Sequence, residues 1–214
     1  MTIVTEEIYE LLRNEVTRLR AKALFGRPGD SVSIRIPGHE KLLIAASDTE
    51  ELRPVRFDHE GDDPEGFHAA IYRTRKDAGA VLIGSTPWSA ALASLEAALP
   101  VLFDEQARHI GKTGHPVPLG RRRLALRTLR RGGNVTLYGD RRICVGTTPN
   151  RVVLNADLFE KCCKAFVIAY ASGDRIHEVP ALVRYIARGR LERDKQRAAT
   201  SYEQGRIPEG MDAY

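Results

Sequence analysis

The stretch FHAAIYRTRKDAGAVLIGSTPWSAALAS, residues 67–94, contains the signals that decide the fold. Phe67, Ile71 and Arg75 recur at helical spacing, which predicts a helix with one face turned toward the core. The apolar run AVLIG, residues 80–84, then predicts a short buried strand. A helix followed at once by a buried strand indicates a domain in which helices pack on a sheet.

The end of that strand leads into a second helix. Pro87 is tolerated in the first turn of a helix, and either Ser85 or Thr86 can cap it. The residues WSAALASLEAAL, 88–99, continue the helical pattern. The tip of the strand therefore reads Ile83-Gly84-Ser85, and it is the first place to examine for chemistry.

The residues before this stretch predict a helix and a hairpin. Thr5 can cap a helix whose apolar residues recur at helical spacing up to Gly26. The runs SVSIRI (31–36) and KLLIAA (41–46) predict two strands. Pro37-Gly38-His39-Glu40 between them has the composition of a turn, so the strands form a hairpin. A polar connection rich in Asp, Glu and Pro follows.

The residues after this stretch predict two helices and two strands. RRRLALRTLRR (121–131) is helical and stops at a Gly-Gly pair. NVTLYG (134–139) and RICVGT (142–147) predict strands on either side of a tight turn. Asn155 can cap a long helix, ADLFEKCCKAFVIAYA (156–171), that ends at a glycine.

Length and composition fit one soluble domain. With 214 residues, 43% of them hydrophobic and 29% charged, the chain can bury a sizeable core. We place this domain over residues 1–189. The segment 190–214 is polar, and we expect an irregular tail that can dock on a neighbouring subunit.

The sequence predicts a cytoplasmic protein. It has no apolar run of about 18 residues, the length that crosses a membrane. The first residues, MTIVTEEIYELLRNE, are acidic, whereas a signal peptide begins with basic residues. Cys144, Cys162 and Cys163 are too few and too unevenly spaced for a disulfide framework, so we expect them to be buried.

Clustered arginines contribute to a net charge of +5, and they raise the question of a nucleic-acid partner. The clusters include 121–123 and the segment 184–197. Proteins that bind single-stranded nucleic acid add aromatic side chains for stacking, but aromatic residues make up only 7% of this chain and are scattered. A solvated helix face or a subunit contact explains the arginines as well. We therefore expect neither nucleic acid nor a membrane as a partner.

From about Ile8 to Ala171 the chain resembles the class II aldolase and adducin head domain family. The resemblance is carried by SVSIR, KLLIAAS, residues 67–94 and NVTLYGDRRICVGTTPNRVVLNADLFEKCCKAF (134–166). Its most specific part is a helix ending in Tyr-Arg-x-Arg-x-Asp-Ala-x-Ala-Val, followed by a strand and Ser/Thr-Pro-aromatic. The resemblance implies a three-layer α/β/α sandwich around a mostly antiparallel central sheet, usually assembled as a homotetramer.

The resemblance also implies a divalent metal, held by a His-x-His pair at the end of the strand and a third histidine in a turn. Residues i and i+2 of a strand face the same way, so two imidazoles converge on one ion, which acts as a Lewis acid on a hydroxycarbonyl substrate. In this sequence the pair falls on Ile83 and Ser85, and the third histidine on Asp140, followed by Arg141. Only Asp140 carries a metal-binding group, and we expect it to pair with an arginine. The sequence therefore predicts no metal and no cofactor.

The family's other functional positions are also changed. Its general acid/base glutamate falls on Pro64, and two serines that help to bind phosphate fall on Asp62 and Asp63, which would repel it. Glu65 is one position away, about 100° around a helix. The phosphate-binding Gly-Asn loop corresponds to Gly29-Asp30-Ser31.

The histidines offer no replacement for the missing ligands. His68 lies on the helix within the fold-deciding stretch, where we expect it to be packed and structural. His109 and His115 lie in ARHIGKTGHPVP, six positions apart, with no strand or helix to align them on one ion.

Two classes of function remain open. The first is a binding or assembly module without aldolase activity, as in the adducin head. The second is an enzyme that uses the cleft for metal-independent lyase chemistry, of an aldolase or decarboxylase kind, on a small carboxylate or carbonyl compound. Arg141 and Arg142 favour a small carboxylate ligand, because guanidinium recognises carboxylates through paired hydrogen bonds. The candidate cleft residues are Asp62, Asp63, Ser85, Tyr138, Asp140 and Arg141, with His68.

Overall fold

The computed structural model describes residues 3–49, 51–173 and 175–209. A six-stranded sheet lies at its centre, in the order β3-β2-β1-β4-β6-β5, and all neighbours are antiparallel. The strands are β1 (Ser31–Ile36), β2 (Lys41–Ala46), β3 (Leu52–Arg56), β4 (Ala80–Gly84), β5 (Val135–Tyr138) and β6 (Arg141–Gly146). The helices are α1 (Ile3–Ala21), α2 (Pro64–Thr74), α3 (Pro87–Ser94), α4 (Arg122–Arg130), α5 (Pro149–Ser172) and α6 (Ala181–Glu203), with a π-helical turn η1 (Gln106–Ile110).

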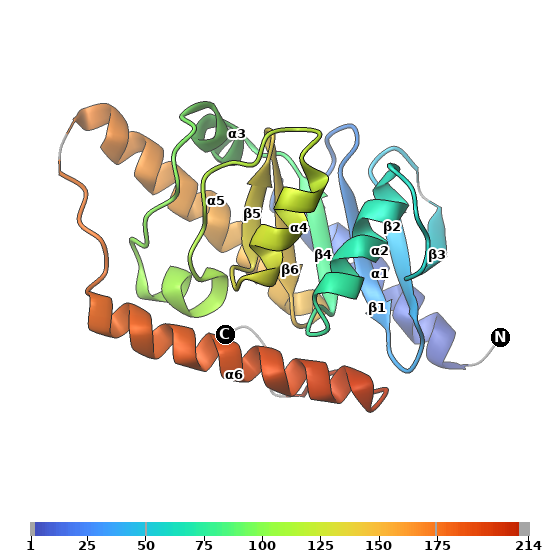
Figure 1. Cartoon of the computed structure of the whole chain (residues 1–214). Coiled ribbons are helices and arrows are strands. Elements are labelled where there is room, and N and C mark those ends of the chain that lie inside the picture. The colour runs from blue at the N-terminus through green and yellow to red at the C-terminus, as the bar shows by residue number, and fades with distance from the viewer. Residues whose placement is uncertain (1–2, 50, 174, 210–214) are drawn as a thin grey trace.

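Helices cover both faces of the sheet and give three layers (Figure 1). α1 and α5 pack on one face, and α2 and α4 on the other. Alternation along β4 supplies both cores: Ala80 and Leu82 belong to the core under α1 and α5, whereas Val81 and Ile83 belong to the core under α2 and α4. The predicted α/β/α sandwich with an antiparallel sheet is confirmed.

The fold-deciding stretch forms α2, β4 and α3. Thr86 is the N-cap of α3 and Pro87 occupies its first turn, as predicted. The backbone N–H of Thr86 donates to Ser89 Oγ at 3.1 Å, which closes a capping box. The capping box fixes the direction in which the chain leaves the tip of β4.

Three predictions of local structure are wrong. The polar connection contains β3, whose edge position lets it carry polar side chains and Pro54. α1 begins at Ile3, so Thr5 lies inside it rather than at its cap. α5 is capped by Thr148, and Asn155 lies within the helix, where its Nδ2 donates to Val145 O at 2.8 Å.

The predicted irregular tail is a further correction, because α6 runs through residue 190 and continues to Glu203. Two buried side chains anchor the helix to its own chain: the Lys195 ammonium donates to Gly132 O, and the Tyr202 hydroxyl donates to Thr147 O at 2.8 Å. The Tyr202 ring also lies 5.0 Å from the Arg35 guanidinium. The apolar residues of α6 do not form a continuous face, so the sequence lacks the periodic pattern that predicts a helix.

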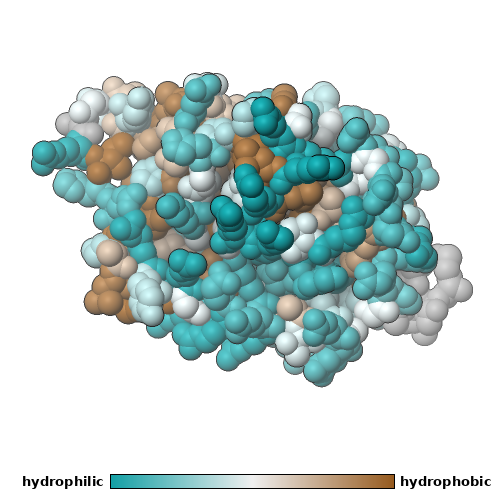
Figure 2. All heavy atoms as spheres, viewed as in Figure 1, coloured by the Kyte–Doolittle hydropathy of each residue, from teal (hydrophilic) through white to brown (hydrophobic). Residues whose placement is uncertain are grey.

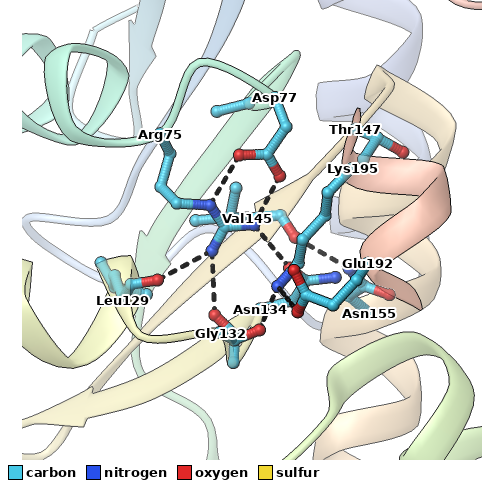
Figure 3. A network of polar contacts seen from close by, with 12 residues as sticks. Arg75, Asp77, Leu129, Gly132, Asn134, Val145, Thr147, Asn155, Glu192 and Lys195 are labelled. Carbon is cyan, nitrogen blue, oxygen red and sulfur yellow. Dashed lines mark hydrogen bonds and ion pairs between the residues drawn. The ribbon is translucent and has the colours of Figure 1, made fainter. Parts of the chain in front are cut away.

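A buried polar network lies beneath α6 (Figure 3). Arg75, just after α2, makes two hydrogen bonds to Asp77, at 2.8 and 2.6 Å. Its guanidinium also donates to Asn134 Oδ1 and to the carbonyl oxygens of Leu129 and Gly133. Burial acts to raise the pKa of Asp77, but the bonds and charge of Arg75 outweigh it and lower that pKa. The pair is therefore ionised and fully hydrogen-bonded.

Candidate functional site

Ile83 and Ser85, the two residues at the tip of β4, have different surroundings. Ile83 is buried, 6% exposed, in the core under α2 and α4. Ser85 is also buried, and its Oγ donates to the backbone oxygen of Asp140 at 3.1 Å. The Ser85 hydroxyl thus ties the tip of β4 to the turn between β5 and β6.

The carboxylate of Asp30 closes the same tip. Asp30 is 1% exposed and accepts hydrogen bonds from the backbone N–H groups of Gly26 (3.1 Å), Arg27 (2.9 Å) and Ser85 (3.2 Å). It lies so close to the strand that a Cβ added to Gly84 would be 2.8 Å from Asp30 Oδ1. Three backbone donors therefore fix a buried negative charge at the tip.

The guanidinium of Arg141 turns toward Asp30. Its Nη1 lies 3.8 Å from Asp30 Oδ1 and donates to Gly29 O at 2.7 Å, and its Nη2 donates to Pro28 O at 3.0 Å. The predicted pairing of Asp140 with an arginine is wrong, since the exposed Asp140 forms no ion pair within the part of the chain that the structure describes. A buried carboxylate attracts the guanidinium more strongly than a solvent-screened one.

Arg142 was missed as a structural residue, because the sequence favoured it as a ligand-binding arginine. It is fully buried, with Nη1 donating to Thr86 Oγ1 at 2.6 Å and Nη2 to Leu24 O at 2.6 Å. The Thr86 hydroxyl donates in turn to Glu160, whose other oxygen accepts from the backbone N–H of Trp88 at 2.9 Å. Glu160 therefore caps α3, and the buried Arg142 cannot contact a ligand at the surface of the tip. The alternation of side chains along β6 is the sequence signal that could have shown this arginine to face the interior.

Asp63 holds the start of α2, whereas Asp62 is exposed and contacts α4. Asp63 is the N-cap of α2, with Oδ1 accepting from Gly66 N at 2.7 Å, a bond that lowers the pKa of its carboxyl. Asp62 Oδ1 lies 3.6 Å from Arg122 Nη1. Among the described residues no hydrogen bond or ion pair joins either aspartate to Ser85. Pro64, on which the resemblance places the family's acid/base group, is the first residue of the helix.

Tyr138 supports the turn from the other side. Its hydroxyl accepts a hydrogen bond from Gly120 N at 2.9 Å, and its ring meets Phe67 edge-on with 5.4 Å between centroids. Tyr138 is thus held by the loop before α4 and by α2, so it shapes one wall beside the turn.

His68 is packed as predicted. It is fully buried, and its two ring nitrogens bond to the hydroxyls of Ser31 (2.9 Å) and Ser33 (2.7 Å). Burial, with a smaller contribution from the charge of Arg122, lowers the pKa of His68 to about 3. The imidazole is therefore neutral and joins α2 to β1.

His109 and His115, which we expected outside any helix or strand, make simple contacts, and the expectation is wrong for His109 because it lies in η1. His109 contacts Arg151, with 2.8 Å between His109 Nδ1 and Arg151 Nη1, and burial lowers the pKa of this histidine to about 4. His115 Nδ1 bonds to Glu96 O at 2.9 Å. The three cysteines are buried and unpaired, as predicted.

Comparison with known proteins identifies the fold built around this tip. The sequence model of the Class II Aldolase and Adducin N-terminal domain matches residues 31–167. The chain belongs to this family. No curated protein sequence matches it.

Solved structures share the fold of this class II aldolase-family chain. YgbL from Klebsiella pneumoniae is 17% identical, with 85% of this chain and 98% of that chain covered and a TM-score of 0.72. L-fuculose 1-phosphate aldolase from Glaciozyma antarctica PI12 is 16% identical, with 95% and 91% covered and a TM-score of 0.71. L-fuculose-1-phosphate aldolase from Thermus thermophilus is 21% identical, with 78% and 93% covered and a TM-score of 0.59. At these identities the likeness is one of fold.

Proposed function

We propose that this family member is a binding or assembly module that does not perform metal-dependent aldol chemistry. The observation that carries the proposal is the Asp30 carboxylate facing the Arg141 guanidinium at the tip of β4. A guanidinium there supplies the positive charge that the family obtains from a metal ion. This charge belongs to a side chain, so it cannot leave the protein as a metal ion can. The guanidinium already donates hydrogen bonds to two backbone carbonyl oxygens.

The residues at the family's metal positions do not fit a divalent ion. Ile83 offers only hydrocarbon, the Ser85 hydroxyl donates to Asp140 O, and the Asp140 side chain points into solvent. Within residues 3–49, 51–173 and 175–209, no three His, Cys, Asp or Glu side chains are placed to hold a metal. A site of the family type needs three donors that converge on one ion with an open fourth position. We therefore route no chemical step through a metal.

A retro-aldol assay tests this proposal. The purified chain is incubated with L-fuculose 1-phosphate and added Zn²⁺, and the Thermus thermophilus aldolase is assayed beside it. We expect no cleavage above the rate without protein, because Pro64 provides no acid/base group and the β4 tip no Lewis acid. Zinc-dependent cleavage that disappears in Ser85→Ala would overturn the proposal.

The assembly we propose is a cytoplasmic homotetramer. No helix among the described residues is long and apolar enough to cross a membrane. Large apolar side chains are exposed near the end of α5 and the start of α6, where Leu182 is 70% and Tyr185 77% exposed. Exposed apolar surface of this kind favours a subunit contact.

Light scattering at micromolar concentration tests the tetramer. We expect the parent to have the mass of four chains and the variant Leu182→Arg/Tyr185→Arg to dissociate, because the substitutions place charges on the apolar contact. A monomeric parent contradicts this part of the proposal.

A second candidate is recognition of a small carboxylate by Arg141, whose side chain is 32% exposed. A thermal-shift screen with dicarboxylates, hydroxy acids and sugar phosphates tests it, since a ligand that binds the native state raises the melting temperature. We expect a shift with dicarboxylates that Arg141→Gln abolishes. Stabilisation by sugar phosphates alone, or a dicarboxylate shift that survives in Arg141→Gln, rules this candidate out.

A further inference from the structure

A cleft of about 1240 Å³ lies between η1, the first turn of α5 and α6. It lies away from the tip of β4, because Tyr202 anchors α6 against Gly79 and Thr147, at the other end of that strand. Figure 2 shows the surface over α6, along the lower edge of the molecule, as largely hydrophilic. The side chains of α6 that line the cleft include Val183, Ile186, Ala187, Arg190, Arg193, Asp194, Arg197, Thr200 and Ser201.

Helical spacing concentrates positive charge on one wall of this cleft. Arg190, Arg193 and Arg197 are related by i, i+3 and i+7, so they share one face of α6. Arg108 comes from η1 on the opposite wall and pairs with Asp194 at 2.5 Å. Four guanidinium groups therefore surround the paired carboxylate of Asp194 at this point of the cleft, whose wider lining also includes the carboxylates of Asp104, Glu105 and Glu209.

The α6 arginines have donors to spare. In the part of the chain that the structure describes, Arg190 and Arg197 form no ion pair, and Arg193 donates only from Nε, to Gly189 O in its own helix. Arg108 Nη1 is buried and has no hydrogen-bond partner among the described residues. A buried donor without an acceptor is unfavourable, and an anion that supplies several oxygens relieves it.

The chemistry of the lining selects the kind of anion. Guanidinium groups bind phosphate through paired hydrogen bonds, and several on one wall match its three or four oxygens. Val183, Ile186 and Ala187 add a short apolar surface beside them. Among the described residues the lining contains no Phe, Tyr or Trp, so it lacks the large aromatic rings on which bases commonly stack.

We propose that the α6 cleft binds a phosphate-bearing small molecule, with the phosphate against Arg190, Arg193 and Arg197. The site is separate from the β4 tip and does not depend on the function proposed for that tip. At this site the chain recognises a phosphorylated ligand through α6. It does not use Gly29-Asp30-Ser31, the segment that corresponds to the family's phosphate-binding loop.

Calorimetric titration with inorganic phosphate and with phenyl phosphate tests the site. We expect saturable binding to the parent, tighter for phenyl phosphate because of the apolar wall. The variant Arg190→Gln/Arg197→Gln should bind about tenfold more weakly or worse, since each charge-assisted bond to phosphate contributes roughly that factor. Both residues are exposed, so the variant keeps the buried anchors of α6.

The matched control is Arg130→Gln/Arg188→Gln, which removes the same charge from two exposed arginines outside the cleft. We expect it to bind both probes as the parent does, and both variants to keep the parent's denaturation midpoint. The proposal is overturned by a parent that shows no saturable binding at millimolar probe, or by a cleft variant that binds as tightly as the control. Equal weakening of both variants, which indicates general charge attraction, also overturns it.

Discussion

The two ends of β4 are each closed by an arginine and an aspartate, but the two pairs are built differently. At the Ala80 end, Arg75 and Asp77 share two direct hydrogen bonds, and their side chains are only 5% and 10% exposed. At the Gly84 end, Asp30 and Arg141 are 3.8 Å apart, and each side chain is satisfied by backbone groups. The first pair is a single hydrogen-bonded unit, whereas the second is two separately held charges.

The two pairs should therefore contribute differently to the stability of the protein. A buried pair whose members depend on each other leaves an uncompensated charge when one is removed. Removal of the partly exposed Arg141 leaves Asp30 with its three backbone donors, so we expect it to cost less. We therefore expect substitutions of Arg141 at the Gly84 end, where the resemblance places the family's chemistry, to be better tolerated than substitutions of Arg75 at the Ala80 end.

The largest contrast is expected between two glutamine substitutions. Arg75→Gln leaves Asp77 buried without its partner and should lower the free energy of unfolding by about 3–5 kcal/mol. Arg141→Gln removes a partly exposed cation while Asp30 keeps its backbone donors, and should cost about 1 kcal/mol. Urea denaturation of the two variants measures both values. Equal losses would show that the two pairs do not differ in the way their contacts indicate.

The glycines at the two ends offer a second contrast. A Cβ on Gly79 would lie 2.0 Å from Tyr202 Oη and 2.4 Å from Thr147 O, a backbone atom that cannot move aside easily. Gly79→Ala should therefore cost about 1–3 kcal/mol and loosen α6. A Cβ on Gly84 meets the Asp30 carboxylate first, at 2.8 Å, which is a longer approach than at Gly79 and to a side chain, so Gly84→Ala should cost about 1 kcal/mol. Hydrogen exchange of the α6 amides, with denaturation of both variants, tests this order; faster α6 exchange in Gly84→Ala than in Gly79→Ala would reverse it.

The smallest effect that we predict comes from His68, which makes the free energy of unfolding depend on pH. Its pKa falls from 6.5 in the unfolded chain to about 3 in the folded chain, so between these values the unfolded state binds the extra proton. Stability therefore rises with pH through this window and is lost as the pH falls. One such proton changes the free energy of unfolding by about 1 kcal/mol between roughly pH 6 and roughly pH 5. Denaturation of the parent and of His68→Asn at both pH values tests this, and an unchanged slope in the variant would contradict it.

Local periodicity was sufficient to predict most of the sandwich. The alternating residues of β1, β2 and β4 and the capped start of α3 are short-range patterns that need no knowledge of distant contacts. β3 was missed because an edge strand with one solvent-facing side has no strong apolar alternation. α6 was missed because only a few buried side chains, such as Lys195 and Tyr202, hold it to the body of the molecule.

The candidate site was harder to predict because its partners are distant in the sequence. The resemblance placed Ile83, Ser85 and Asp140 at one tip, and the Ser85 hydroxyl does contact the Asp140 backbone. Arg141 faces Asp30 because the fold brings the turn before β6 next to the loop that contains Gly29 and Asp30, more than 100 residues away in the sequence. No local pattern encodes that choice, so the sequence favoured the neighbouring Asp140 instead.

The tip of β4 carries a carboxylate, Asp30, and a guanidinium, Arg141, and we propose that it binds no metal ion. The most direct measurement is the metal content of the protein purified without chelators, determined by elemental analysis beside its Ser85→Ala and Asp140→Ala variants. We expect far less than one equivalent of zinc, manganese, iron or cobalt per chain, with no change in either variant. One equivalent of a divalent transition metal in the parent that is lost in Asp140→Ala would contradict it.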